Sequence, residues 1–162
     1  MNIFEYHLAE IKDLISSKKN ILKLDQVDNF KGINLEIPPD KFNFDLSCNI
    51  AMVLGKKNKI DPKDLAKKIK ELFLKNINNF SEIEIAGPGF LNIKLSKKAL
   101  INNINSILEN NKTYGSIKSN EFYNIEFVSA NPTGPMHVGH CRGAIFGDGL
   151  SNLLKFNGNQ VI

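Results

Sequence analysis

The sequence predicts two parts: an α+β domain over residues 1–112 and, over residues 121–162, the first strand, helix and strand of a parallel α/β domain. Two observations support this division. In the first part, apolar residues recur at helical spacing in some runs and at strand spacing in others, with turn residues between the runs. The second part has one strand-like run, one turn, one long helical pattern and a second strand-like run. We expect a linker at residues 113–120.

Apolar residues at helical spacing predict four helices in the first part. The first begins near Phe4, the second covers residues 46–54 and is closed by Gly55, and the third opens at Pro62. Ser96 should cap the fourth helix. Its apolar residues should face inward: Leu100, Ile101, Ile104, Ile107 and Leu108.

Alternating apolar residues predict the strands of a small antiparallel sheet, with the helices packed on one of its faces. One strand covers residues 33–37, and residues 82–86 and 91–95 form a hairpin around a Gly-Pro-Gly turn. Phe90, at the tip of this turn, could stack on a nucleobase or belong to the core. We favour the core, because Phe90 continues the apolar set of the hairpin.

The second part predicts a Rossmann-like α/β nucleotide-binding domain that is truncated after its first strand, helix and strand. Residues 123–128 form the first strand, residues 131–135 break it, and the helix runs until Asn157 and Gly158. Residues 160–162 begin the next strand. In such a unit the ligand binds between the carboxyl end of the first strand and the amino end of the helix.

His137 and His140 lie one turn apart at the predicted start of this helix, beside backbone N–H groups that have no partner within the helix. Such a site can hold phosphate oxygens, and losing one donor of this kind costs about 2.7–4 kcal/mol in catalysis. Gly139, Gly143 and Gly147 clear one helical stripe for a flat ring or a neighbouring backbone. Two histidines alone could also be surface residues or part of a metal site, but no Cys or acidic residue stands at zinc-like spacing.

The segment around these histidines resembles the signature region of class I aminoacyl-tRNA synthetases, and among them the bacterial arginyl-tRNA synthetases. Upstream, residues 49–54 and 85–92 look like the N-terminal appended domain of that family. The lead-in begins at Phe127, and the signature motif comprises Ala130, Asn131, Pro132, Thr133, Gly134, Pro135, Met136, His137, Val138, Gly139 and His140.

The resemblance implies an arginine–tRNA ligase that uses ATP, with Mg²⁺, to join L-arginine to tRNA(Arg). His137 and His140 would be the catalytic residues that contact the ATP phosphates, and Gly139 would leave room for the adenosine. Ser129, Asn131 and His137 would hold the arginine, and Glu126 would face its guanidinium group. A carboxylate suits that role because it accepts paired hydrogen bonds from a planar guanidinium, although Glu126 taken alone could be a solvated charge.

Members of the family run to several hundred residues and carry a second signature with a lysine, which is not present in residues 1–162. We therefore expect this chain alone to be inactive. The alternative is a non-catalytic tRNA-binding module derived from the appended domain. No residues are assigned as metal ligands.

Charge and composition add little to the mechanism. Residues 1–120 hold 19 Lys and 14 acidic residues, a balance of +5, and residues 121–162 have a balance of −1, which together give the net charge of +4. The basic excess is compatible with contact to RNA and also ordinary for a protein. Two cysteines in no disulfide pattern predict a reduced, cytoplasmic compartment. Acidic residues in the first apolar run and the lack of an apolar span predict a protein without a signal peptide or membrane segment. The family resemblance implies a monomer for the full-length enzyme.

Overall fold

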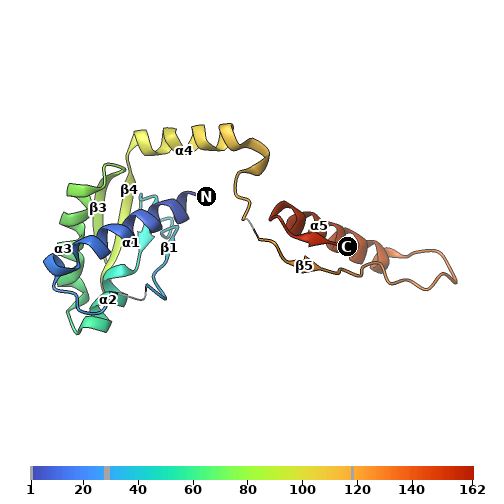
Figure 1. The fold of residues 1–162 in the computed structure, drawn as a ribbon, viewed down its shortest axis with the longest axis horizontal. Coiled ribbons are helices and arrows are strands. Elements are labelled where there is room, and N and C mark those ends of the chain that lie inside the picture. Colours follow the sequence, from blue (N-terminus) through green and yellow to red (C-terminus); the bar gives the residue numbers. More distant parts are fainter. Residues whose placement is uncertain (1, 28–29, 118) are drawn as a thin grey trace. The chain divides into compact units, whose positions relative to one another are not determined.

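A computed structural model describes residues 2–27, 30–117 and 119–162, and the chain divides into two compact units (Figure 1). The N-terminal unit is Asn2–Glu109 and the C-terminal unit is Asn110–Ile162. None of the helices in the described ranges is long and apolar enough to cross a membrane.

The N-terminal unit is an α+β domain built on a four-stranded antiparallel sheet with the strand order β1-β2-β4-β3. The helices α1, α2 and α3 cover one face of this sheet, and the core lies between them. The elements are α1 (Ile3–Leu22), β1 (Leu35–Glu36), β2 (Leu46–Cys48), α2 (Ile50–Asn58), α3 (Pro62–Asn76), β3 (Phe80–Ala86), β4 (Phe90–Leu95) and α4 (Lys97–Asn110).

Most of the predicted elements of this unit are confirmed. Helix α1 begins with a capping box, in which the side chain of Asn2 accepts from Glu5 N at 2.9 Å. The Asp61 side chain caps α3 ahead of Pro62, and the Ser96 hydroxyl accepts from Ala99 N at 3.2 Å at the start of α4. Strands β3 and β4 form the expected hairpin.

The predicted helix over residues 46–54 is wrong in its first part. Residues Leu46–Cys48 form β2, which pairs with β1 and β4 inside the sheet and buries Leu46 and Cys48 on the helical side. Pairing with β1 and β4 stabilises the strand more than the local apolar pattern stabilises a helix. Gly55 does not close the helix either: it is buried within α2, where an added Cβ would lie 2.9 Å from the carbonyl oxygen of Ile60.

Two asparagines tie the loop before β1 to helix α2. The Asn49 amide accepts from Asn34 N and donates to the carbonyl of Gly32, both at 2.9 Å. The Asn58 amide accepts from Asp25 N and Gln26 N, both at 2.8 Å, and donates to Leu54 at 2.9 Å. These bonds satisfy backbone groups that the loop would otherwise leave without partners.

Two further predictions about apolar residues are wrong. The strand β1 ends at Glu36, and Ile37 is 74% exposed. The apolar residues of α4 do not face inward, since among the described residues of that helix only Ala99 is buried. We call the following residues, which are 39–70% exposed, the α4 stripe: Leu100, Ile101, Ile104, Ile107 and Leu108.

The C-terminal unit has the predicted strand–helix–strand order. After a short 3-10 helix, η1 (Asn111–Thr113), it contains β5 (Phe122–Tyr123), α5 (Val138–Phe156) and β6 (Gln160–Val161), and β5 pairs with β6 in parallel. Strand β5 is shorter than predicted. Ile125 N donates to the carbonyl of Ile162 at 2.9 Å, and residues 126–128 have no strand partner among the described residues.

Candidate nucleotide site and sheet-face pocket

Helix α5 is capped by the two histidines of the predicted site. His137 is the N-cap, and its Nδ1 accepts from Gly139 N at 3.1 Å. Nδ1 of His140 accepts from His137 N at 3.3 Å, and the two rings stack with their centroids 3.8 Å apart. A ring nitrogen that accepts carries no proton, so each neutral imidazole has its proton on Nε2. The cap thereby fixes the tautomer and leaves two N–H donors for a ligand.

Two glycines of α5 are explained by close contacts. An added Cβ at Gly139 would lie 3.0 Å from Cε1 of His137, so only glycine lets that ring fold back over the helix end. At Gly147 an added Cβ would overlap the ring of Phe127, which packs against the helix there. Gly143 has open space, with no described atom within 4 Å of its added Cβ. The glycine stripe thus admits a flat ring at two positions, and both rings belong to the chain itself.

Three of the predicted arginine-binding residues, Glu126, Ser129 and Asn131, lie in the irregular segment before the helix. The Ser129 hydroxyl donates to Glu126 Oε1 at 2.7 Å, and both side chains are exposed. Within this segment Val128 and Ser129 have φ angles of 77° and 31°, in the left-handed region. A valine is rare there, and such backbone strain is often found at binding sites.

The structure brings the expected site residues together in two groups. Glu126 contacts Ser129, and the histidines form the helix cap with Gly139. Asn131 is exposed in the lead-in and has no hydrogen bond to another described residue. No group of three or more His, Cys, Asp or Glu side chains that could hold a metal ion occurs in the described ranges.

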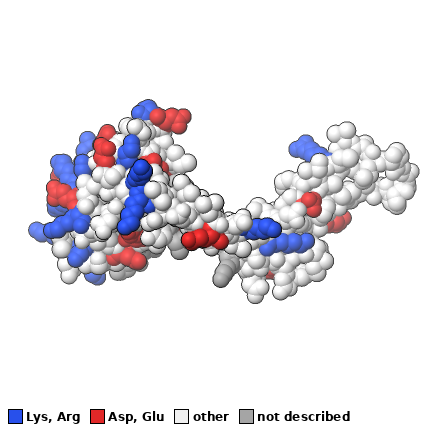
Figure 2. Space-filling view, turned by 90° about the horizontal axis from the view of Figure 1, so that it is seen from above, with Lys and Arg blue, Asp and Glu red and all other residues white. Residues whose placement is uncertain are grey.

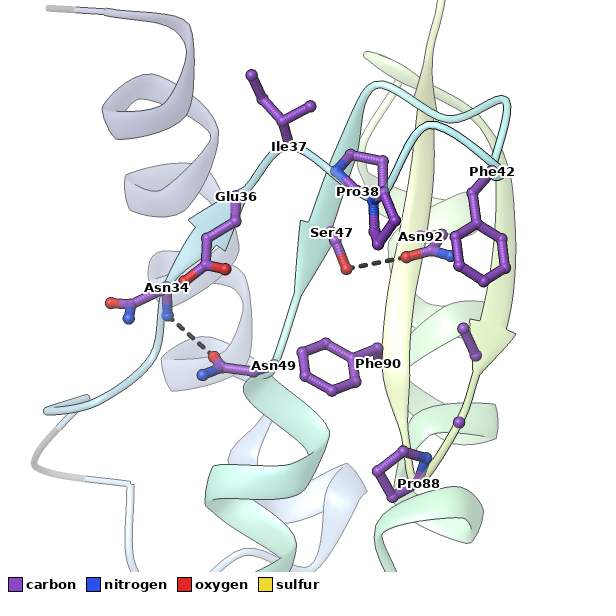
Figure 3. Close-up of a pocket in the computed structure, with 13 residues that line it drawn as sticks. Asn34, Glu36, Ile37, Pro38, Phe42, Ser47, Asn49, Pro88, Phe90 and Asn92 are labelled. Carbon is purple, nitrogen blue, oxygen red and sulfur yellow. Dashed lines mark hydrogen bonds between the residues drawn. The ribbon is translucent and has the colours of Figure 1, made fainter.

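A second candidate site is a pocket of about 410 Å³ on the face of the N-terminal sheet opposite the helices (Figure 3). Phe90 and Asn92 are two residues apart on β4 and therefore project to the same side of the sheet. Phe42, Pro38 and Pro88 add apolar surface around them.

A row of polar side chains crosses the sheet at this pocket. The strand register places Glu36 beside Ser47, Ser47 beside Asn92, and Asn92 beside Glu84. Asn92 is only 2% exposed, and its Oδ1 accepts from the Ser47 hydroxyl at 2.8 Å. Its Nδ2 has no hydrogen-bond partner among the described residues. A buried amide that keeps an unused donor is costly unless a ligand accepts from it.

Sequence reasoning missed this pocket. Phe90 is half-buried and lines the pocket instead of joining the core, so the core prediction for it is wrong. The missed signal is Asn92, a polar residue between the buried Leu91 and Ile93. In an alternating strand such a residue points to the opposite face, where only a polar partner or a ligand can satisfy it.

On the face of the N-terminal unit that Figure 2 shows, acidic side chains lie among the lysines. Two pKa values are shifted. Burial raises the pKa of the Cys48 thiol to about 12. The hydrogen bond from the Tyr123 hydroxyl to Glu121 raises the pKa of Tyr123. Neither group lines the two candidate sites.

Family models match both parts of the chain. The arginyl tRNA synthetase N terminal domain matches residues 9–95, and the catalytic domain of class I (R) tRNA synthetases matches residues 103–162. Arginine–tRNA ligase of Pelagibacter ubique is 46% identical over 99% of this chain and 28% of its own length. The corresponding ligase of Bartonella henselae is 45% identical over the same shares. The chain thus spans somewhat more than a quarter of the relatives' length.

Solved structures agree on the fold. Arginyl-tRNA synthetase from Plasmodium falciparum superposes with a TM-score of 0.65 at 21% identity, covering 94% of this chain and 29% of that one. The synthetase of Thermus thermophilus gives a TM-score of 0.60 at 20% identity, covering 95% and 24%. The chain belongs to the arginyl-tRNA synthetase family, whose N-terminal domain it contains together with the start of the class I catalytic domain.

Proposed function

We propose that this chain is the N-terminal portion of an arginine–tRNA ligase, which converts ATP, L-arginine and tRNA(Arg) into arginyl-tRNA(Arg), AMP and diphosphate. The observation that carries the proposal is the pair of imidazoles at the start of α5, whose Nδ1 atoms are used by the helix cap while their Nε2 atoms bond to no other described residue. A monomer acting in the cytoplasm fits this function.

In the first step the arginine carboxylate attacks the α-phosphate of ATP, and diphosphate leaves. His137 and His140 would donate from Nε2 to phosphate oxygens, where their hydrogen bonds strengthen as negative charge builds up. Gly139 would leave room for the adenosine. Mg²⁺ would come with ATP and neutralise phosphate charge.

Recognition of arginine would depend on the turn before the helix. Glu126 would accept two hydrogen bonds from the guanidinium, and Ser129, which already donates to Glu126, would hold that carboxylate in place. Asn131 and His137 would contact the rest of the amino acid. An amide oxygen can accept from the substrate ammonium without burying a second charge.

The test uses a chimera that joins residues 1–162 to the remaining carboxyl-terminal part of the Pelagibacter ubique relative. We expect arginine-dependent ATP–diphosphate exchange by the chimera and none by the 162-residue chain. Glu126→Gln should raise the KM for arginine about 100-fold, because a charge-assisted pair is lost, and leave the KM for ATP unchanged.

Asp148→Asn is the matched control, since this exposed carboxylate contacts only Asn152 among the described residues. His140→Ala should instead lower kcat by about 10²–10³. Exchange that does not depend on arginine, or a Glu126→Gln variant with the KM of the parent, would contradict the proposed arginine site.

The sheet-face pocket favours tRNA as the partner of the N-terminal unit, which also fits the alternative of a non-catalytic tRNA-binding module. Its volume suits a nucleobase, the ring of Phe90 offers a stacking surface, and Nδ2 of Asn92 offers a donor to a base edge. Stacking of a base on an aromatic side chain stabilises binding by about 1–3 kcal/mol.

Phe90→Leu in the 162-residue chain should therefore weaken tRNA binding about tenfold, measured by fluorescence anisotropy at fixed salt. The dependence of affinity on salt should not change, because no charge is removed. Tyr6→Leu, an exposed aromatic residue on α1, is the control. Equal affinities for both variants and the parent would exclude the pocket as the tRNA contact.

A further inference from the structure

The α4 stripe faces away from the N-terminal unit. Ala99 is the one buried residue among those described in α4 and marks the side that touches the unit. At about 100° per residue, the middle of the stripe lies about 140° around the helix from Ala99. Figure 1 shows α4 extending beyond the sheet of its own unit. The stripe therefore cannot complete the core of residues 2–109.

The pattern of the stripe is that of a buried helix face. Leu100, Ile101, Ile104, Ile107 and Leu108 fall within a sector of about 120°. Among the residues of α4, the one charged or polar side chain in this sector is Lys97, which stands in the first turn, before the stripe begins. Asn102, Asn105 and Glu109 occupy the opposite side. An exposed apolar surface of this regularity is typical of an interface, and one without charge is typical of a permanent interface.

The family matches indicate what covers the stripe. The N-terminal-domain match ends at residue 95, before α4, whereas the catalytic-domain match begins at residue 103, inside α4. Most of the stripe therefore belongs by sequence to the catalytic domain, although α4 continues directly from β4 of the N-terminal unit. The relatives contain more than twice as much chain beyond the matched region as within it.

We propose that the α4 stripe is the docking surface for the part of the class I catalytic domain that follows residue 162 in the longer relatives. The proposal rests on the proposed function. Docked in this way, α4 holds the N-terminal unit in one orientation relative to the catalytic domain. A tRNA bound by the N-terminal unit is then held at a defined distance from the nucleotide site.

The experiment compares amide hydrogen exchange in the 162-residue chain with that in the Pelagibacter ubique chimera. We expect the amides of α4 to exchange at least about tenfold more slowly in the chimera. Ile104→Glu with Ile107→Glu should remove this protection. The same pair should leave the melting temperature of the 162-residue chain unchanged, because there the stripe faces solvent. Asn102→Glu with Asn105→Glu is the control on the polar side of the helix and should preserve the protection.

The outcomes separate this proposal from the proposed function. A chimera that forms arginyl-adenylate with unprotected α4 amides overturns the docking surface and leaves the ligase assignment standing. A protected α4 in a chimera without exchange activity supports the docking surface alone. A concentration-dependent dimer of the 162-residue chain in sedimentation velocity, abolished by Ile104→Glu with Ile107→Glu, would assign the stripe to self-association and overturn the proposal.

Discussion

At several positions of this chain, the tertiary surroundings decide which residue is tolerated more than its helix or strand propensity does. Gly139 and Gly147 sit in α5 although glycine weakens helices by about 1 kcal/mol each, because rings of His137 and Phe127 occupy the space of a side chain. Cys48 is a thiol that the core keeps protonated. For the two glycines, the loss of helix stability is offset by ring contacts that only the folded chain provides.

The variant Gly55→Ala tests whether tertiary contacts outweigh helix propensity at one position. Alanine normally stabilises a helix relative to glycine by about 0.5–1 kcal/mol, but at Gly55 its Cβ meets the backbone of Ile60 and Pro62. We expect Gly55→Ala to destabilise the N-terminal unit by about 1–3 kcal/mol in urea unfolding. Lys56→Ala, on the exposed side of the same helix, should change stability by less than about 0.5 kcal/mol. A stabilising Gly55→Ala would show that the helix can move away from Pro62.

The raised pKa of the buried Cys48 thiol predicts how the stability of the N-terminal unit changes at alkaline pH. The folded pKa of about 12 exceeds the unfolded value near 8.5, so the folded state holds its proton more tightly. Stability is fully present below about pH 8.5 and falls as the pH rises, because the unfolded chain releases a proton there. Between pH 7 and 9.5 we expect a loss of about 1 kcal/mol that Cys48→Ala lacks. Cys141→Ser, at an exposed thiol, should keep the loss.

Among the elements, the short strands and loops depend on side chains from elsewhere. The loop before β1 is attached to α2 by the amides of Asn49 and Asn58, and β2 exists because β1 and β4 flank it. Strand β5 pairs with β6 at Phe122 and Tyr123. The long helices are different, since their caps and apolar spacing are local.

Asn58→Ala should therefore destabilise the N-terminal unit by about 2–4 kcal/mol, because four backbone hydrogen bonds of about 1 kcal/mol each lose their partner. Asn76→Ala removes one bond within its own helix and should cost about 1 kcal/mol. Urea unfolding of both variants measures the difference. Equal losses would mean that the loop is not held by Asn58.

On the scale of the whole molecule, the two units differ in how much apolar surface they bury. The N-terminal unit has a continuous core, whereas α5 buries only Gly147 and Ser151 among its described residues. Val138, Ile145 and Phe146 of α5 are 72–85% exposed. A two-stranded parallel sheet covered by one helix cannot bury enough surface for independent stability.

Amide hydrogen exchange of the 162-residue chain should show this difference. We expect the amides of β3 and β4 to exchange only with global unfolding, and those of β5, β6 and α5 to exchange at least about tenfold faster. Limited proteolysis should remove the C-terminal unit first. Equal protection in the two units would show that residues 110–162 are stable without further chain.

The sequence alone determined the long helices, the hairpin, the strand–helix–strand order and the position of the histidine pair at a helix start. Caps, apolar period and turn residues act over a few neighbours, so they can be read without tertiary contacts. The family followed from the same local motif. The expected roles of Glu126, Ser129, Asn131 and the histidines remain predictions.

Only the tertiary structure decided that Leu46–Cys48 is a strand, that Phe90 and Asn92 line a pocket, and that the α4 stripe faces solvent. The first two depend on partners far along the chain: β4 for β2, and the register of three strands for the polar row. The stripe is exposed because no described element of the N-terminal unit covers it. Periodic apolar residues predict that a face of an element will be buried, but they do not predict which other element covers that face.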